Sequence, residues 1–299
     1  MFDLPIVDAH HHLADLSRSY PWLEGEPVKR YHGDDVPLRR NYFLPDYLAD
    51  TKNLNLIGSV HIENGAADSK AEAAWVHQVI RENGLPTAQV AKVDFTSPNA
   101  AELLEFHSQF DTVRGIRDIL NWHSNPFYTH RAQSDLMQNP TWLANFKLLA
   151  RYGMSFDLQV FIHQLDEAAT LVNQHPEIPV VLDHAGMPIE RDAEGLARWQ
   201  KAMTAFAQTN SMVKISALGT NDHNWTTESI RELVLRTIEI FGVDRVMFAS
   251  NFPVDGLYST LDELYSAFDK ITEHFTRAER EAMFAWNADR FYKLNLKGN

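Results

Sequence analysis

The stretch Ile6-Val7-Asp8-Ala9-His10-His11-His12 governs the interpretation of the whole chain. It begins with apolar, β-branched residues, as a buried strand does, and it ends in three consecutive histidines. Residues two apart in a strand project from the same face, about 6.6 Å apart along the chain. His10 and His12 therefore share a face with Asp8 and could close on one metal ion. His11 points to the opposite face and is expected to be structural. A solvated histidine cluster is the alternative.

Short β-rich runs recur along the chain and alternate with amphipathic helices, one of which has an apolar stripe from Ile230 to Phe241. Capping boxes at Thr260 and Thr276 predict the starts of two more helices. This alternation favours a parallel sheet, and eight such units favour an α/β fold of the (β/α)8 TIM-barrel type. We expect a distorted barrel with a long loop after the first strand and a C-terminal helix. A doubly wound open sheet is the alternative, although no G-x-G-x-x-G or P-loop motif follows any strand. The expected strands cover residues 5–10, 56–63, 87–94, 112–119, 155–161, 178–184, 211–217 and 244–251.

The composition narrows the classes of partner. Lys plus Arg is 27 and Asp plus Glu is 40, for a net charge of -13, which disfavours nucleic acid and anionic membranes. The chain has no cysteine, so a metal would have to rest on His, Asp or Glu. Without a signal-like leader or an apolar run of ~18 residues, we expect a cytoplasmic protein that acts on a small molecule. No linker divides residues 1–299, so we expect one domain; a homo-oligomer is left open.

Polar side chains gather at the ends of the expected strands, where parallel strands should be apolar. Burying each without a partner costs about 1–3 kcal/mol, so we expect these ends to surround a polar, water-filled mouth. The residues concerned are Asp8 with His10 and His12, His61 with Glu63, Lys92 with Asp94, Asp157 with Gln159, Lys214 with Ser216, and the single residues Arg117, His184 and Asn251.

Two of these strand-end residues are candidates for chemistry. His184, in Val180-Val181-Leu182-Asp183-His184, suits a general acid or base or a metal ligand, with a hydrogen-bonded structural histidine as the alternative. Arg117 suits a clamp on a carboxylate or carbonyl, with an interstrand salt bridge as the alternative. We expect Lys214 and Glu63 to pair with charges inside the barrel.

Long connections follow the first and fourth expected strands, at residues 13–45 and 120–139. Both are rich in aromatic and charged side chains. Loops at the carboxyl ends of barrel strands build substrate sites, so we expect Arg40 and Trp122 to bind substrate. Surface decoration is the alternative.

Five motifs occur in a specific order: Asp8-Ala9-His10-His11-His12, Val113-Arg114-Gly115-Ile116-Arg117, Leu182-Asp183-His184-Ala185-Gly186, residues 248–255 (FASNFPVD) and residues 287–292 (NADRFY). Together they resemble the amidohydrolase superfamily, and more narrowly its amidohydrolase-2 branch, which includes sugar-lactone lactonases and 2-pyrone-4,6-dicarboxylate lactonase. The resemblance covers essentially the whole chain. It implies a barrel enzyme that uses water to open small lactones, many of them acidic.

The resemblance also implies residue roles. His10 and His12 correspond to the metal-ligand pair of the first strand, with zinc or manganese as the expected ion. His184 corresponds to the histidine of the sixth strand, and Arg117 to an arginine that contacts substrate.

Two positions depart from the pattern of the family. Asn251 stands where relatives have an Asp that acts as ligand and base, and Asn cannot accept a proton near neutral pH. Gln159 stands where metal-dependent relatives often have His. Both changes weaken the case for a full metal site. Asp255 or Glu63 could supply the missing carboxylate, so we take Asn251 and Asp255 as candidate catalytic residues and Gln159 and Glu63 as candidate substrate-binding residues.

The function that these features predict is hydrolysis of a small, sugar-derived or carboxylated lactone. In this hypothesis water, on a metal held by His10 and His12 or activated by His184, attacks the ring carbonyl. A metal-dependent nonoxidative decarboxylase of a small aromatic or enol acid is the alternative enzyme. A catalytically silent barrel that binds a small acid is the alternative from another class.

Overall fold

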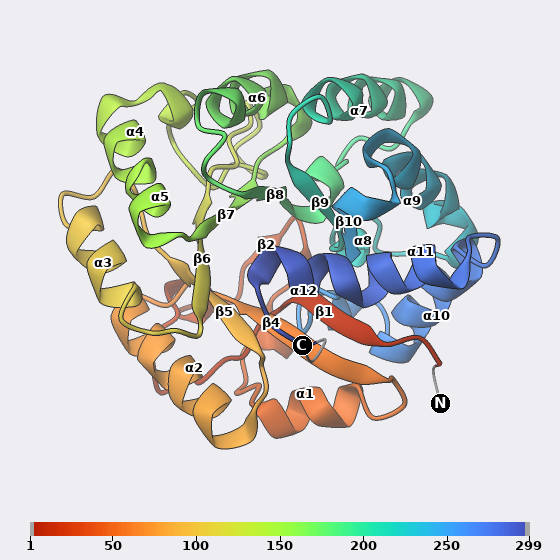
Figure 1. The fold of residues 1–299 in the computed structure, drawn as a ribbon, viewed down its shortest axis with the longest axis horizontal. Helices are drawn as coiled ribbons and strands as arrows, with labels where there is room; N and C mark the ends of the chain where they lie inside the picture. The colour runs from red at the N-terminus through yellow and green to blue at the C-terminus, as the bar shows by residue number, and fades with distance from the viewer. Residues whose placement is uncertain (1–2, 297–299) are drawn as a thin grey trace.

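The computed structural model describes residues 3–296, in which eight parallel strands form a nearly closed barrel ringed by helices (Figure 1). Neighbouring strands in the sheet follow the order of the chain, β1-β4-β5-β6-β7-β8-β9-β10. The predicted barrel is confirmed, and the open doubly wound sheet is excluded. The strands are β1 (Ile6–His11), β4 (Leu56–Ile62), β5 (Ala88–Lys92), β6 (Val113–Ile119), β7 (Ser155–Gln159), β8 (Val180–Leu182), β9 (Met212–Ile215) and β10 (Val246–Phe248).

The barrel closes where the chain after β10 meets the end of β1. The amide of Asn251 donates to the carbonyl of His10, and the amide of His12 donates to the carbonyl of Phe252, both at 2.7 Å. Segments about 240 residues apart in the chain are thereby held together at the barrel mouth. Closure therefore places Asn251 beside the histidines of the first strand.

Helices cover the outside of the barrel, and the apolar stripe predicted from Ile230 to Phe241 is buried on α9. The capping boxes predicted at Thr260 and Thr276 begin α10 and α11. The helices are α1 (Leu44–Asp50), α2 (Ser69–Asn83), α3 (Ala100–His107), α4 (Pro140–Phe146), α5 (Leu148–Tyr152), α6 (Leu165–Gln174), α7 (Ala193–Phe206), α8 (Leu218–Asn221), α9 (Thr227–Phe241), α10 (Leu261–Ile271), α11 (Arg277–Glu281) and α12 (Asn287–Tyr292), with a π-helical turn at Ala282–Trp286 between the last two.

The C-terminal helices close one end of the barrel. In Figure 1 they cross in front of the centre of the ring of strands. Tyr292 of α12 packs in one apolar cluster with Val7, Val90 and Met247, which come from three different strands. Water is thus excluded at this end, and the opposite end, where the strands finish, remains for a site.

The last three strands are shorter than predicted at their carboxyl ends. β8, β9 and β10 stop at Leu182, Ile215 and Phe248, and each is followed within three residues by a residue with left-handed backbone. These residues are His184 (φ 58°), Ala217 (φ 54°) and Asn251 (φ 59°). A left-handed residue cannot continue a strand, so the prediction that these three strands run to 184, 217 and 251 is wrong.

The long segment after β1 contains a small two-stranded sheet, β2 (Lys29–Arg30) and β3 (Gly33–Asp34). This segment and the loop after β6 both contribute to the wall of a cavity at the barrel mouth. Within residues 3–296, no helix is both long and apolar enough to span a membrane.

Candidate active site

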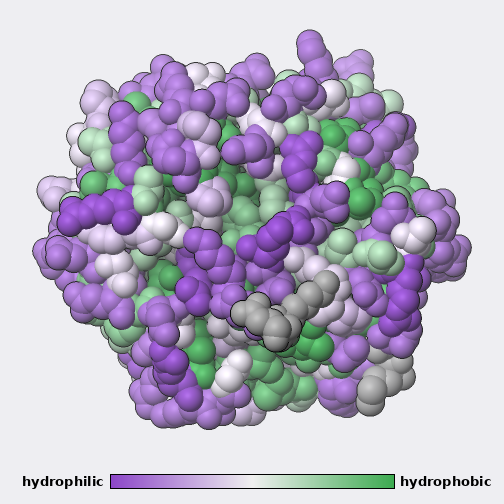
Figure 2. Space-filling view, viewed as in Figure 1, coloured by the Kyte–Doolittle hydropathy of each residue, from purple (hydrophilic) through white to green (hydrophobic). Residues whose placement is uncertain are grey.

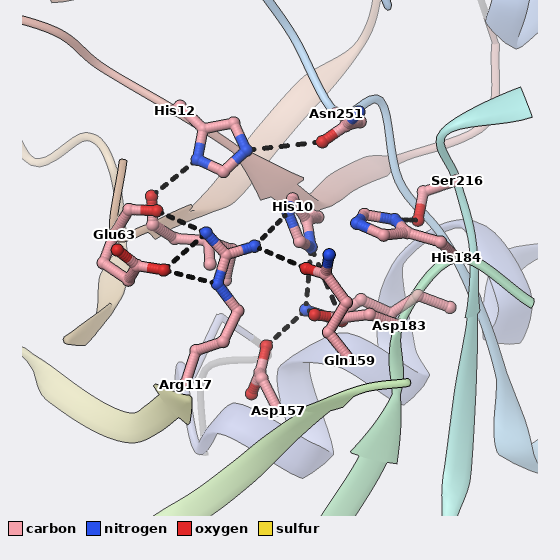
Figure 3. A network of polar contacts seen from close by, with 12 residues as sticks. His10, His12, Glu63, Arg117, Asp157, Gln159, Asp183, His184, Ser216 and Asn251 are labelled. Atoms are coloured by element: carbon pink, nitrogen blue, oxygen red, sulfur yellow. Dashed lines mark hydrogen bonds and ion pairs between the residues drawn. The ribbon is translucent and has the colours of Figure 1, made fainter. Parts of the chain in front are cut away.

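A cavity of about 580 Å³ lies at the carboxyl ends of the strands. Its lining brings together five predicted site residues from far apart in the chain: His12, Arg117, Gln159, His184 and Asn251. Figure 3 shows their side chains grouped around His10, which lies beneath them and is itself fully buried. The mouth that the sequence predicts is therefore a real cavity, with the predicted histidines at its base.

An ion network lies under the cavity and surrounds His10. Lys214 of β9 donates to Asp157 Oδ2 of β7 at 2.5 Å and to His10 Nδ1 at 3.2 Å, and it pairs with Asp183 Oδ1 at 3.0 Å. All four side chains are completely buried. Tyr292 also donates to Asp157 Oδ2, at 2.9 Å, whereas Asp157 Oδ1 and both Asp183 oxygens accept no hydrogen bond from the described residues. Lys214 thus pairs with charges inside the barrel, as the sequence predicts.

The buried charges shift the pKa values of this network. Burial raises the pKa of Asp157 to about 6, against the opposing effect of the Lys214 ammonium. Burial also acts to raise the pKa of Asp183, but Lys214 and His10 outweigh it and hold that pKa well below its usual value. Burial and Lys214 lower the pKa of His10 well below its usual value. At neutral pH His10 is therefore an uncharged imidazole beside an ion pair.

Arg117 of β6 is held mainly by protein acceptors. Its Nε donates to Glu63 Oε1 at 2.7 Å and its Nη2 to the Glu63 carbonyl at 2.6 Å, while Nη1 donates to Gln159 Oε1 at 3.1 Å. Glu63 lies behind the guanidinium rather than in the cavity wall. Arg117 therefore presents a fixed positive charge to the cavity, with few N–H groups free for a substrate.

His12 and Asn251 lie side by side in the cavity wall. Because the Ile62 carbonyl can only accept, His12 Nδ1, at 2.8 Å, is the protonated nitrogen, and Nε2 carries the lone pair. That Nε2 lies 3.3 Å from Asn251 Oδ1, so Asn251 donates to it only when the side-chain amide is turned over. Burial, with Arg117 nearby, lowers the pKa of His12 to about 4, so the ring is neutral at physiological pH.

His184 follows β8 on a tight turn. Its Nδ1 hydrogen-bonds Ser216 Oγ at 2.8 Å, and its ring centroid lies 4.6 Å from that of His10. Burial lowers the pKa of His184 to about 3, and the positive charges of Arg117 and Lys214 act in the same direction. A neutral imidazole that lines a cavity can accept a proton from water at neutral pH.

Asp255 lies behind the cavity wall and does not line it. Its Oδ1 accepts from the amide of Thr220 at 3.0 Å and from the hydroxyl of Thr220 at 2.8 Å. Burial raises the pKa of Asp255 to about 7, although Thr220 and Asn251 hydrogen-bond its carboxylate. In this geometry Asp255 reaches the cavity only through Thr220 and Asn251.

Arg40 and Trp122 lie away from the cavity wall. Arg40 is exposed, packs on the ring of Tyr42 at 5.1 Å, and lines a different cavity, with Phe252 and Leu257. The backbone of Trp122 bonds to Gln164 and His163. Their predicted role as substrate-binding residues is not supported by these positions, because a loop's length does not determine where its side chains point.

Several lining residues received no role from the sequence. Tyr31, from the loop after β1, enters the cavity, and burial raises its pKa to about 12. Lys92 and His130 also line the cavity, from the end of β5 and the loop after β6. Lys92 is among the strand-end residues expected around the mouth, without a specific role, whereas no local pattern marks Tyr31 or His130.

The wall of the cavity is cationic. Lys29, Arg30, Lys92 and Arg117 line it, and among the described lining residues there is no Asp or Glu. Arg30 and Arg117 have carboxylate partners, Asp35 and Glu63. Lys92 Nζ donates to the Ala66 carbonyl at 3.4 Å, and within residues 3–296 no carboxylate lies within ion-pair distance of it, although its charge acts on the buried Glu63 and Glu72. In a protein with a net charge of -13, such a wall is suited to an anion.

His10, Asp183 and His184 form a group whose possible ligand atoms all lie within 4.8 Å of one another. The group includes His10 of the predicted metal pair but not His12, whose ring centroid is 5.0 Å from that of His10. The group does not fit a metal ion as it stands, because two cations face it. Lys214 Nζ lies against His10 Nδ1 and Asp183, and Arg117 Nη1 lies 3.5 Å from His10 Nε2. The His10–His12 metal site stays a prediction, and its surroundings count against it.

Comparison with known proteins identifies the family of this chain. The chain is 40% identical to the protein y4mH of Sinorhizobium fredii, over 98% of this chain and 100% of that protein. It is 28% identical to the L-fucono-1,5-lactonase of Burkholderia multivorans, over 96% of each. A crystal structure of an amidohydrolase from Burkholderia multivorans with bound zinc matches with a TM-score of 0.80 and 23% identity, over 96% of this chain and 99% of that one. The family model described as amidohydrolase, of the amidohydrolase-2 type, matches residues 7–294, and the chain belongs to this family.

Proposed function

We propose that this protein hydrolyses a small lactone that carries a carboxylate, in the cavity at the barrel mouth. The observation that carries the proposal is the combination of neutral histidines, His12 and His184, with a wall that contains cations and no lining carboxylate. Membership in the amidohydrolase family supports a hydrolase. The relative named L-fucono-1,5-lactonase supports a cyclic ester as substrate.

His184 is the general base in this proposal. Its buried ring is neutral and accepts a proton from water as the water attacks the ring carbonyl, while Ser216 holds Nδ1 and orients the ring. His12 Nε2 also carries a lone pair and lies across the cavity wall, beside Asn251. It is the second group able to take or return a proton.

Arg117 stabilises the negative charge that develops on the carbonyl oxygen. Glu63 and Gln159 hold the guanidinium in place, so little reorganisation is needed during the reaction. Asp255 acts as a positioning residue, because it bonds Thr220 and Asn251 rather than facing the cavity. No step passes through a metal ion, since Lys214 and Arg117 already face the His10 group.

Lys92 binds the substrate carboxylate. Among the described lining cations, Lys29 and Lys92 form no ion pair with a carboxylate, and Lys92 is the less exposed of the two. An ammonium in a partly dry cavity attracts an anion more strongly than it does in bulk water. The preferred substrate is therefore a lactone in which a carboxylate replaces a neutral hydroxymethyl group.

The test is acid release, followed with a pH indicator, from a matched pair of lactones. D-galactono-1,5-lactone has a hydroxymethyl group where the 1,5-lactone of galactaric acid has a carboxylate, and the rings are otherwise the same. We expect a higher kcat/KM for the carboxylated lactone. Lys92→Met should lower kcat/KM for the carboxylated lactone about tenfold or more, since one lost charge contact is worth about 1.4 kcal/mol or more.

Lys201→Met is the matched control, because Lys201 is exposed on α7 and the same charge is removed. A preference for the neutral lactone would overturn the carboxylate assignment. Absence of acid release from both lactones would overturn the lactonase proposal. Release of carbon dioxide from 2,6-dihydroxybenzoate under the same conditions would instead favour a decarboxylase.

A further inference from the structure

The Lys214 ammonium lies in the middle of the donor group beneath the cavity. Asp157 Oδ2, Asp183 Oδ1 and His10 Nδ1 surround it at 2.5, 3.0 and 3.2 Å. The contacts with Asp157 and His10 are hydrogen bonds, whereas Asp183 Oδ1 pairs with the ammonium by charge and accepts no hydrogen bond among the described residues. The Lys214 side chain has no exposed surface.

We propose that the Lys214 ammonium is the permanent cation of this site, occupying the position that a divalent metal ion would otherwise take between His10, Asp157 and Asp183. Without Lys214, the imidazoles of His10 and His184 and the carboxylate of Asp183 would remain, with possible ligand atoms within 4.8 Å of one another, and zinc accepts such ligands. Asp157, which now accepts from the lysine, lies next to this group. What excludes the metal is therefore the lysine and not a shortage of ligands.

The orientation of His10 supports this assignment. One ring nitrogen faces Lys214 at 3.2 Å and the other faces Arg117 at 3.5 Å. Whichever nitrogen carries the proton, a metal bound at the other would have to displace a cationic side chain. His10 is thus held as a neutral ring between two positive charges, which is unfavourable for a metal ligand.

Charge balance distinguishes a metal ion that replaces the lysine from one that binds beside it. Lys214 leaves the two carboxylates of Asp157 and Asp183 with one compensating positive charge. A divalent ion added beside the lysine would give this buried set an excess of positive charge, whereas a divalent ion in place of the lysine would make it neutral. Buried groups are stable only when their charges are paired.

The test is the metal content of purified protein, measured by mass spectrometry after equilibrium dialysis against zinc and then against metal-free buffer. The wild type is expected to retain far less than one ion per chain. Lys214→Met removes the charge and is one atom shorter than lysine, which frees the position of the ammonium, and it is expected to retain about one zinc ion per chain. Asp183→Asn in the Lys214→Met background should lose that zinc, and Lys201→Met should behave as the wild type does.

A second readout covers the risk that Lys214→Met unfolds, since it leaves two carboxylates without a cation. Zinc should raise the melting temperature of Lys214→Met and leave that of the wild type unchanged, because an ion that binds the folded state stabilises it. If Lys214→Met cannot be obtained in folded form, the zinc content of the wild type still tests the proposal. One tightly held zinc ion in the wild type, lost in His10→Ala, would overturn the proposal, and so would a folded Lys214→Met that binds no zinc. Neither readout depends on which substrate the enzyme uses.

Discussion

The chemistry of the proposed reaction depends on how individual buried groups are charged. His184 is the clearest case, because burial lowers its pKa to about 3, and neighbouring Arg117 and Lys214 disfavour its charged form further. A histidine in water is partly protonated near pH 6.5, whereas His184 is neutral there; its lower pKa also makes it a weaker base than a free histidine. The barrel thus keeps this ring in its basic form over the whole physiological range.

His184→Gln is expected to lower kcat by about 10²–10⁴-fold, the usual contribution of a general base. In the wild type, no loss of kcat/KM from protonation of His184 is expected between pH 8 and about pH 5, because its pKa lies well below that of a free histidine. The measurement is a pH–rate profile of acid release. His274→Gln, at an exposed site on the surface, is the control. Turnover within a few-fold of wild type in His184→Gln would remove His184 as the base.

Arg117 and Glu63 form a buried pair, with side chains 6% and 3% exposed. Arg117→Met leaves the Glu63 carboxylate buried without its partner, so we expect a loss of about 3–5 kcal/mol in the free energy of unfolding. Arg81→Met breaks a pair with Asp111 in which both side chains are more than half exposed, and should cost about 0–1 kcal/mol. Urea titrations of the two variants make the comparison. Equal effects would mean that the buried pair contributes no more than the surface pair.

At the scale of the elements, the turns after β8, β9 and β10 direct polar residues into the mouth. His184, Ala217 and Asn251 each adopt a left-handed backbone there, and all three line the cavity. This conformation is unfavourable for residues other than glycine and is tolerated best by Asn. It ends each strand abruptly and lets the following side chains meet across the mouth.

Gly115 determines how closely β6, which carries Arg117, approaches β7. A Cβ at this position would overlap the Ser155 hydroxyl and lie 3.0 Å from the Ser155 carbonyl oxygen, a backbone atom. Gly115→Ala should therefore push the two paired strands apart and lower stability by about 1–3 kcal/mol. In Gly256→Ala the new Cβ would meet only the Phe252 ring, at 3.3 Å, which can shift, so a smaller loss is expected. Thermal denaturation of both variants tests this; an equal or larger loss in Gly256→Ala would contradict it.

At the scale of the whole molecule, a cationic cavity lies in an acidic protein. The face in Figure 2 is mostly hydrophilic with small scattered apolar areas, as expected for a net charge of -13. Buried acids make the stability of the folded protein depend on pH. Burial raises the pKa of Asp255 to about 7 and that of Glu72 to about 8, both well above the values of free carboxyl groups.

Asp255 should make the folded protein less stable as the pH rises. Its folded pKa is higher than its unfolded pKa, so between the two values the folded state holds more protons, and stability falls from about pH 4 until the pH passes about 7. Asp255→Asn cannot ionise. From pH 5 to pH 8 the melting temperature of the wild type should fall by several degrees more than that of Asp255→Asn, on the order of 2 °C per kcal/mol. The melting temperature of Asp111→Asn, a variant at an exposed site, should fall as much as that of the wild type does.

Much of the architecture could be predicted because its signals are local. Alternating apolar runs and helical stripes placed all eight strands and the capped helices α10 and α11, since side-chain period and capping depend on neighbouring residues. The polar side chains at the ends of the expected strands predicted a polar mouth of the barrel. They include five residues that line the cavity there, His12, Arg117, Gln159, His184 and Asn251. Closure of a parallel barrel brings the ends of all strands to one side, so these residues could be expected to meet.

What the sequence by itself determined is therefore the barrel and the set of strand-end residues around its mouth. Only the tertiary structure decided that Lys214 lies against His10, that Asp255 stands behind Asn251, and that Arg40 and Trp122 lie elsewhere. Strand periodicity fixes the face on which a side chain lies, but ion pairing across the barrel and the path of a loop depend on contacts between residues far apart in the chain. Such contacts form only when the chain has folded, and no local pattern records them.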